Sequence, residues 1–295
     1  MDKFLQFLAH GIMIGGIYGL VALGLVLIYK SSRVLNLSHG FFLMILAWLC
    51  WSFTEQLGLP IGLSIVLVLA VSVVAGLGVE RFILRPLIGQ PILAIVTVTL
   101  ALGYLLEGVA IMAWGADTKG LPEFIPREAI WLGPVSIAQH YLWAFGIAIL
   151  IFILLYLFFR YTKMGLSMQI VSEDQQVARS LGISVKNVFA QTWAFALVMA
   201  AIAGILYASL HAVSNFNALI GLNKALPVML LGGLESLPGA LIGGIIIGIF
   251  ESVGAGYIDP LVGGGTSDVI PLVLMLLILL IRPSGIFGWK RIERI

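Results

Sequence analysis

The sequence predicts an all-α membrane protein, a polytopic bundle of about nine transmembrane helices, and three observations support this fold class. Hydrophobic residues make up 61% of the 295 residues and charged residues only 10%, against about 45–50% and about 25% in average soluble chains. A soluble domain could not cover so much apolar side chain, because it must present a polar surface to water. Apolar stretches of about 20 residues, the length that spans a bilayer, also recur along the whole chain. The first partner predicted is therefore the lipid bilayer.

The predicted helices are best described as windows of apolar sequence. Nine windows reach the spanning length or nearly do so: 4–29, 36–54, 60–81, 91–114, 140–160, 188–211, 218–234, 238–254 and 269–287. The seventh and eighth are short and rich in glycine, so we expect them to be broken or re-entrant. Eight or ten crossings are the alternative counts. The first window lacks the basic start and short apolar core of a signal peptide, so we interpret it as retained.

The distribution of lysine and arginine predicts the orientation, because cytoplasmic connections carry an excess of both. With nine crossings and a cytoplasmic C-terminus, the N-terminus lies outside. Twelve of the 16 basic residues then lie on the inner side: Lys30, Arg33, Arg81, Arg85, Arg160, Lys163, Arg179, Lys186, Arg282, Lys290, Arg291 and Arg294. The opposite orientation would reverse this ratio.

Several classes of protein are disfavoured by what the sequence lacks. The single cysteine, Cys50, cannot form a disulfide within the chain. A net charge of +2 is too small to indicate a nucleic-acid partner. No G-x-x-x-x-G-K-[ST] phosphate loop and no H-E-x-x-H motif are present, so we predict neither a bound cofactor nor an enzyme. No segment is long enough for a separate soluble domain, and residues 1–295 are treated as one transmembrane domain.

The inner connection, residues 161–187, predicts a short helix that binds another protein. Ser172 and Gln175 have the spacing of a capping box, and Gly182 suits the left-handed residue that ends a helix. Small Ala178 would lie on the surface of this helix, which could then enter a groove on a partner. The candidate docking residues are Ser172, Glu173, Asp174, Ala178, Arg179 and Gly182. The alternative is a solvated connector.

Polar residues at the start of the second window are candidates for a solute pathway. Asn36 and Ser38 are good helix N-caps, and His39 follows directly. One interpretation is ordinary cap chemistry near the inner interface. The other is a broken helix whose backbone lines a pathway, which a membrane tolerates only where protein or water covers it. No second ligand stands at helical spacing from His39, so a metal site is not predicted.

Other polar groups lie within or beside the apolar windows. A carboxylate in mid-membrane costs about 2.5–3.5 kcal/mol, so Glu107 and Glu251 should face the bundle interior, a cavity or the outer interface. Glu107 is the deeper of the two and is a pathway candidate, whereas the position of Glu251 favours the interface. Thr97 and Thr99 either bond their own backbone or contact solute. Lys224 either receives an external protein or extends to water.

Glycine recurs every fourth residue in two of the windows. The repeats are Gly11, Gly15 and Gly19, then Gly239 and Gly243, and then Gly244 and Gly248. This spacing places a flat stripe on one helix face and allows two helices to approach closely. We therefore predict tight helix packing here rather than ligand contact.

Three stretches resemble the permeases of ABC importers, and they occur along this chain in the same order as in that family. An acidic residue, Ala178 and Gly182-Ile183 are similar to the coupling loop of these permeases. Residues 31–40, with Val-Leu-Asn-Leu-Ser-His-Gly, and residues 227–244, with Leu-Leu-Gly-Gly-Leu-Glu-Ser-Leu-Pro-Gly-Ala, resemble the branched-chain amino acid permeases, particularly the H-type subunit. One departure is Gln-Val-Ala at 176–178, where the broader motif has Glu-Ala-Ala, so any ion pairing would fall to Glu173 or Asp174.

The resemblance implies a permease subunit in a bacterial inner membrane, acting with other proteins. Its implied partners are a second permease, two cytoplasmic ATPase subunits that use ATP, and an external solute-binding protein. The implied substrates are branched-chain or other hydrophobic amino acids, with amides, urea or aromatic acids as alternatives. A secondary transporter or a channel would use a similar architecture and stays an alternative class.

Overall fold

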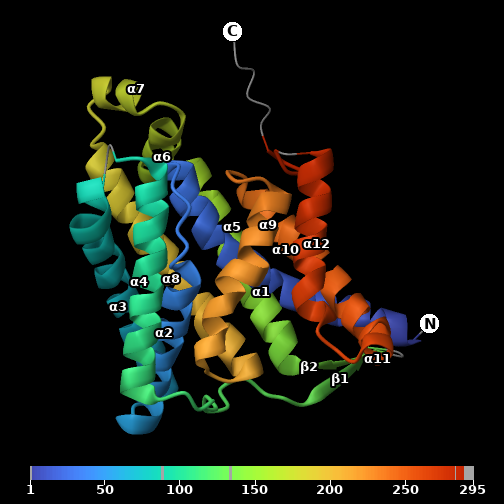
Figure 1. Ribbon diagram of the computed structural model, residues 1–295. Coiled ribbons are helices and arrows are strands. Elements are labelled where there is room, and N and C mark those ends of the chain that lie inside the picture. The colour runs from blue at the N-terminus through green and yellow to red at the C-terminus, as the bar shows by residue number, and fades with distance from the viewer. Residues whose placement is uncertain (1, 88–89, 133–134, 283, 289–295) are drawn as a thin grey trace.

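Six helices in the described part of the chain are long and apolar enough to cross a membrane. The computed structural model describes residues 2–87, 90–132, 135–282 and 284–288. The six are α1 (Asp2–Ser32), α3 (Ile61–Val79, extended by a π-helical and a 3₁₀ turn to Leu87), α4 (Ile92–Trp114), α5 (Gln139–Tyr161), α8 (Val185–His211) and α10 (Leu237–Tyr257). They coincide with six of the nine predicted windows and confirm the all-α polytopic bundle (Figure 1).

The other three windows form shorter or interrupted helices. They are α2 (His39–Trp51) with the π-helical turn Ser52–Gln56, α9 (Leu226–Gly232) preceded by the short helical segments Asn215–Ala218 and Gly221–Ala225, and α12 (Thr266–Ile281) preceded by α11 (Asp259–Val262). The seventh window is therefore broken, as predicted. The eighth is not, because α10 is continuous over 21 residues. Its glycines lie on a helix face that another helix covers.

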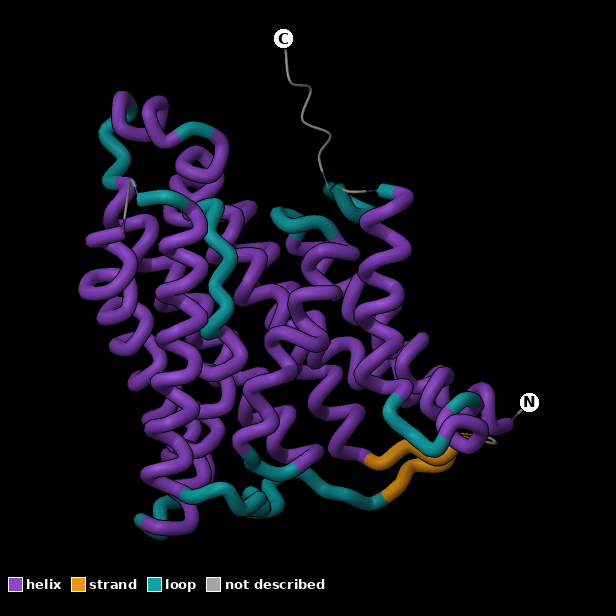
Figure 2. The backbone as a smooth tube through the Cα atoms, viewed as in Figure 1, coloured by secondary structure: helices purple, strands orange, loops and turns teal. Residues whose placement is uncertain are grey.

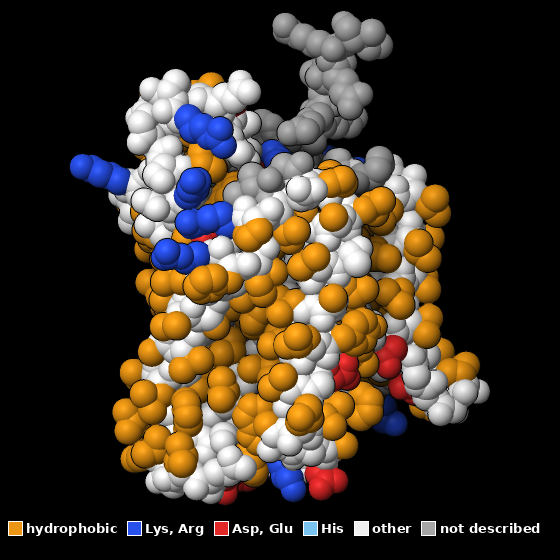
Figure 3. All heavy atoms as spheres, turned by 60° about the vertical axis from the view of Figure 1, so that its left-hand side comes forward, with side chains coloured by type: hydrophobic (Ala, Val, Ile, Leu, Met, Phe, Trp, Pro, Cys, Tyr) orange, Lys and Arg blue, Asp and Glu red, His pale blue; other side chains and the backbone are white. Residues whose placement is uncertain are grey.

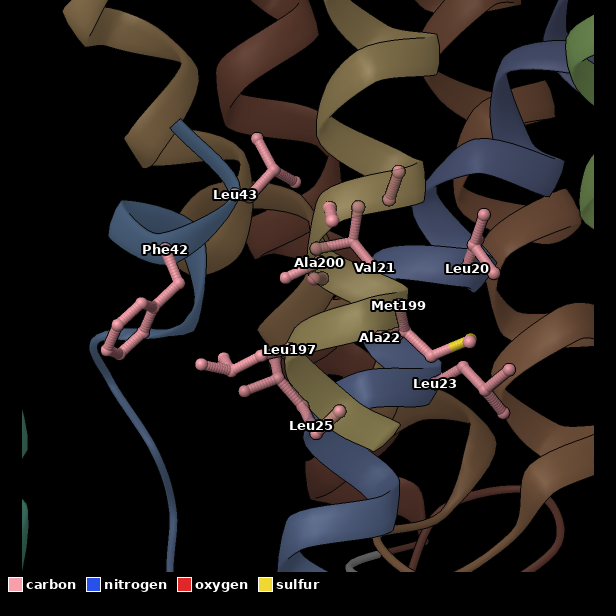
Figure 4. Close-up of a cluster of buried hydrophobic side chains, with 14 of the residues drawn as sticks. Leu20, Val21, Ala22, Leu23, Leu25, Phe42, Leu43, Leu197, Met199 and Ala200 are labelled. Carbon is pink, nitrogen blue, oxygen red and sulfur yellow. The ribbon is translucent and has the colours of Figure 1, made fainter. Parts of the chain in front are cut away.

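Helix α1 is the centre of the bundle. Almost all of its side chains from Gly11 to Ile28 are buried, and it packs against α10, α8 and α5. Figure 4 shows Leu20 and Leu23 of α1 in the same apolar cluster as Leu43 of α2 and Leu197 of α8. A helix that is apolar on all sides suits this position, because it meets protein in every direction.

The two glycine stripes face each other across α1 and α10. A Cβ atom on Gly15 would lie 2.5 Å from the carbonyl oxygen of Gly244, and one on Gly11 would lie 2.6 Å from that of Gly248. Both distances are too short for any larger residue, so the backbones are in direct contact. The predicted tight packing is confirmed.

The two ends of the bundle carry different elements. Helices α6 (Lys163–Glu173) and α7 (Gln175–Ser180) project from one end, which we call the α7 end, and strands β1 (Ala129–Leu132) and β2 (Val135–Ala138) lie at the other, the hairpin end (Figure 1). The strands pair antiparallel, with Ala129 opposite Ala138. The start of α1 is bound to this hairpin, since the Gln6 carboxamide accepts from Ser136 N at 2.9 Å and donates to its carbonyl. The hairpin was not predicted.

The surface divides in the way expected of a membrane protein. Figure 3 shows a broad zone of hydrophobic side chains, with lysine and arginine gathered beside α6 and α7. Helix α1 begins at the hairpin end, and α12 ends at the α7 end (Figure 1). Lys290, Arg291 and Arg294, which the orientation also uses, lie outside the described residues.

Replacing Gly15 by leucine is expected to lower the melting temperature of the protein purified in detergent, because the side chain would force α1 and α10 apart. Overpacking a core typically costs about 1–3 kcal/mol. Gly108→Leu on α4 is the matched control, since no described heavy atom outside its own helix backbone lies within 4 Å of a Cβ at that position. Equal melting temperatures of the two variants would contradict the close helix packing.

Candidate functional site

The chain enters the bundle without helical structure between α1 and α2. Residues 33–38 descend from the α7 end, and α2 begins about midway between the two ends (Figures 1 and 2). Asn36 Oδ1 accepts hydrogen bonds from Ser38 N at 3.1 Å and from Ser38 Oγ at 2.6 Å. Asn36, Ser38 and His39 are all at least 98% buried. The chain is therefore irregular ahead of α2, as the broken-helix interpretation requires, whereas Ser38, the N-cap residue, makes no side-chain cap hydrogen bond to α2.

Helix α4 supports this segment through one of its two candidate threonines. The Leu37 N–H donates to Thr99 Oγ1 at 3.3 Å, and Thr99 is completely buried. Thr97 is exposed and its hydroxyl donates to Leu93 O of its own helix, so it lies apart from the site. Glu107 is half-buried on the same helix, about 12 Å farther along at 1.5 Å per residue.

A second interrupted helix crosses the start of α2. A Cβ atom on Gly221 would lie 2.6 Å from Gly40 Cα, so the two backbones touch where both helices are irregular. The His39 ring packs against Gly24 of α1, where a side chain would overlap with it. Asn36 Nδ2 is buried and has no hydrogen-bond partner among the described residues. Asn36, Ser38 and His39 thus belong to the segment that leads into α2, and Thr99 contacts that segment.

A buried charge cluster lies nearer the hairpin end. Lys224 Nζ is 3.1 Å from Glu251 Oε1, and the two side chains are only 10% and 13% exposed. The Tyr18 hydroxyl donates to the same carboxylate oxygen at 3.0 Å. Lys224 also donates to the Ser267 carbonyl and lies 3.4 Å from Asp268 Oδ1. The Lys224 ammonium group is therefore held by the protein and does not extend to water, and the Glu251 side chain is covered by protein.

Two cavities lie at opposite ends of α1. The one at the hairpin end measures about 480 Å³ and has Tyr18 and Glu251 in its wall. The one at the α7 end measures about 620 Å³ and is lined in part by Lys30, Arg160 and Glu235. Between them α1 is packed on all sides. No group of three or more His, Cys, Asp or Glu side chains in the described ranges is placed to hold a metal ion.

The inner connection contains two helices rather than the single one predicted over 172–182. Asp174 caps α7, since its Oδ1 accepts from Gln176 N at 2.7 Å and Val177 N at 3.1 Å. Ser172 instead lies in the last turn of α6, where its hydroxyl donates to Gln169 O. The predicted capping box of Ser172 is wrong, because α6 begins nine residues earlier and includes it.

Helix α7 presents different residues from those predicted. Ala178 is fully buried, so its predicted place on the helix surface is wrong. Its neighbours Val177 and Leu181 are 49% and 64% exposed. Glu173, Asp174 and Arg179 are exposed as well, and Gly182 ends the helix with a φ of 77°, as predicted. The exposed large apolar side chains of α7 and its C-cap are therefore those of Val177 and Leu181.

Arg33 joins the inner connection to the broken helix. It begins residues 33–38 with a φ of 59°, a left-handed backbone that is uncommon outside glycine. Its guanidinium donates to the Ser172 carbonyl at 3.2 Å and forms an ion pair with Glu235, between α9 and α10. Sequence spacing could not reveal this, since the partners are 139 and 202 positions away.

The matches to known proteins cover almost the whole chain. Residues 7–279 match the model of the family described as branched-chain amino acid transport system, permease component. The BraD high-affinity branched-chain amino acid permease of Pseudomonas aeruginosa is 28% identical over 99% of this chain and 98% of its own. LivH of Escherichia coli K12 is 27% identical with the same coverage, and a probable LivH of Methanocaldococcus jannaschii is 28% identical over 94% of this chain and 90% of its own.

A solved structure supports the same fold. PsaBC from Streptococcus pneumoniae, in complex with a Fab, superposes with a TM-score of 0.50 and 17% identity. The match covers 96% of this chain and 94% of the other.

Replacing Thr99 by valine is expected to lower the melting temperature, because the partly buried Leu37 N–H would lose its acceptor, at a cost of about 1–3 kcal/mol. Thr97→Val is the control, since that hydroxyl bonds only within its own helix and is exposed. Thermal unfolding in detergent measures both. If the two variants melted together, Thr99 would not support the broken helix.

Proposed function

The chain belongs to the family of branched-chain amino acid transport permeases, and we propose that it forms part of the solute pathway of an ABC importer for branched-chain or other hydrophobic amino acids. It is a multi-pass inner-membrane permease subunit. The observation that carries the proposal is the similarity to BraD and LivH, which extends over 99% of the chain. Amides, urea or aromatic acids are the alternative substrates.

The proposed orientation places the α7 end in the cytoplasm. Cytoplasmic ends of membrane proteins are enriched in lysine and arginine, and these residues gather around α6 and α7 (Figure 3). The N-terminus and the β-hairpin then lie outside. The cavity of about 480 Å³ then lies at the outer end, from which an importer receives solute.

The energy would come from other subunits. The sequence has no phosphate-binding loop, so ATP would be used by two cytoplasmic ATPases, and a second permease and an external binding protein would complete the importer. Residues 1–295 would act as one transmembrane domain, with residues 161–187 as its cytoplasmic coupling loop.

We assign ATPase docking to the exposed face of α7. Val177 and Leu181 present apolar side chains to the cytoplasm, whereas Ala178 anchors the helix from its other face. Apolar groups at the centre of an interface with charged groups at its rim are the common pattern of protein recognition. Glu173, Asp174 and Arg179 would supply that rim.

Arg33 connects α6, which packs against the docking helix α7, to the segment that leads into the membrane interior. Ser172 belongs to α6, which packs against α7, and its carbonyl accepts from Arg33. From Arg33 the chain runs directly through Asn36 to the start of α2. A displacement of α6 would therefore be transmitted to the broken helix and, through Glu235, to the connection between α9 and α10.

Copurification tests the importer against a secondary transporter or a channel. Expressed with its candidate ATPases and isolated in mild detergent, the chain should retain them and should take up leucine in proteoliposomes only with ATP and binding protein. Uptake by the isolated chain alone would overturn the proposal. Competition by amides, urea or aromatic acids would identify the alternative substrates.

Replacing Leu181 by aspartate should reduce ATPase binding by about 30-fold, because a central interface residue commonly contributes about 2 kcal/mol or more. Leu57→Asp is the matched control, as Leu57 is 63% exposed at the opposite end. Copurified ATPase is the measure. Full retention of ATPase by the Leu181 variant would place docking elsewhere.

Replacing Arg33 by glutamine should leave ATPase binding intact but lower the ratio of uptake to ATP hydrolysis by about tenfold, because the ion pair with Glu235 and the charge-assisted hydrogen bond to the Ser172 carbonyl, about 1.5–3 kcal/mol for the latter, are both lost. Arg160→Gln removes an equally basic side chain whose hydrogen bond stays within its own helix. The ratio of uptake to hydrolysis is measured for both. A ratio unchanged from the original protein would exclude Arg33 from transmission.

A further inference from the structure

The cavity at the hairpin end has the size and position of a small-molecule site. It measures about 480 Å³ and lies between the first half of α1 and the second half of α10, with His211 of α8 in its wall. Pockets for small ligands commonly occupy about 300–1,000 Å³ and are mostly apolar with a few polar groups. The wall at Glu251 belongs to the buried charge cluster, so the cavity and the charges form one feature.

Glu251 is only half satisfied by the protein. Its Oε1 accepts from both Tyr18 and Lys224, whereas its Oε2 is buried and has no hydrogen-bond partner among the described residues. Lys224 is meanwhile shared between Glu251, the Ser267 carbonyl and Asp268. Two carboxylates therefore face one ammonium group. A buried charged oxygen without a donor is unfavourable, and a cationic group bound beside the Glu251 carboxylate would offset this cost.

The remaining wall suits the other parts of an amino acid. Ser252 Oγ and His10 Nδ1 lie 3.4 Å apart and offer a hydroxyl and an imidazole that can donate to a carboxylate. Phe7, Ile14 and Ala255 supply an apolar surface. One anionic oxygen, neutral donors and an apolar wall are the complement of an α-ammonium, an α-carboxylate and an aliphatic side chain.

We propose that this cavity binds the substrate α-amino acid directly, with Glu251 receiving its α-ammonium group. The proposal rests on the proposed function and deepens it, because the permease would then recognise the zwitterion itself after an external protein has delivered it. Lys224 and Tyr18 hold the carboxylate in place and act as positioning residues. Solutes without an ammonium group would leave Glu251 unsatisfied and bind poorly.

Photolabelling of the assembled importer tests the site without relying on the external protein. The probe is a leucine that carries a diazirine in its side chain, applied to the permease–ATPase complex in detergent. Label is expected on peptides of α1 and α10 that contain Phe7, Ile14 or Ala255. Leucine should compete with the label, whereas 4-methylpentanoate, which lacks the ammonium group, should not. Label confined to other helices, or equal competition by both compounds, would overturn the proposal.

Variants separate substrate binding from mere support of the fold. Glu251→Gln should reduce labelling by about tenfold or more, as expected for loss of a charge-assisted hydrogen bond. Glu55→Gln, which alters an exposed carboxylate, should label normally. In the double variant Lys224→Met and Glu251→Met both charges are absent. If that variant labelled and transported normally, the pair would be structural only and the proposal would fail.

A failure of this site assignment can be distinguished from a failure of the proposed function. If the unaltered importer transports leucine but Glu251→Gln labels normally, the site assignment is wrong and the importer assignment stands. If the unaltered assembly moves no amino acid with ATP and binding protein, the importer assignment itself fails, and the site falls with it.

Discussion

The structure depends on one constraint, which is that backbone polar groups at membrane depth need partners within the protein. Residues 33–38 and Gly221–Ala225 both depart from regular helix inside the bundle. The first survives because Thr99 accepts from Leu37 N and Asn36 folds back onto Ser38. The two segments lie beside the contact between Gly40 and Gly221, where the absence of side chains allows the backbones to touch. Irregular structure here is therefore compatible with a membrane only because neighbouring helices cover it.

The same constraint explains the charges. A buried ion pair seldom adds net stability, but removing one partner leaves a costly uncompensated charge. Lys224 joins the segment Gly221–Ala225 to α10 and α12, and Tyr18 adds α1. Four segments distant in sequence are thus tied at one point beside a cavity. Such a cluster can change its partners when a charged solute arrives, which an apolar core could not do.

Much of the fold could be predicted because the bilayer imposes a length and an apolar composition on each crossing. The glycine stripes were also readable, since helical spacing places Gly11 and Gly15 on one face. What could not be predicted depends on distant contacts. The partners of Lys224 are far along the chain, and the burial of Ala178 depends on how α7 packs against the helices on either side of it. Short polar sequences carry little information about which helix turn includes them, and the predicted cap at Ser172 failed for that reason.

The brevity of α12 has a consequence for the surrounding lipid. Its 16 residues rise about 24 Å at 1.5 Å per residue, less than the hydrocarbon thickness of about 30 Å. The apolar side chains of Leu276 and Leu280 are largely exposed there. A span this short is accommodated by local thinning of the bilayer or by flanking polar side chains that reach the interface, whereas the 27-residue span that starts with α3 is long enough to cross without either. Thinning of the surrounding bilayer is therefore expected beside α12 rather than beside α3.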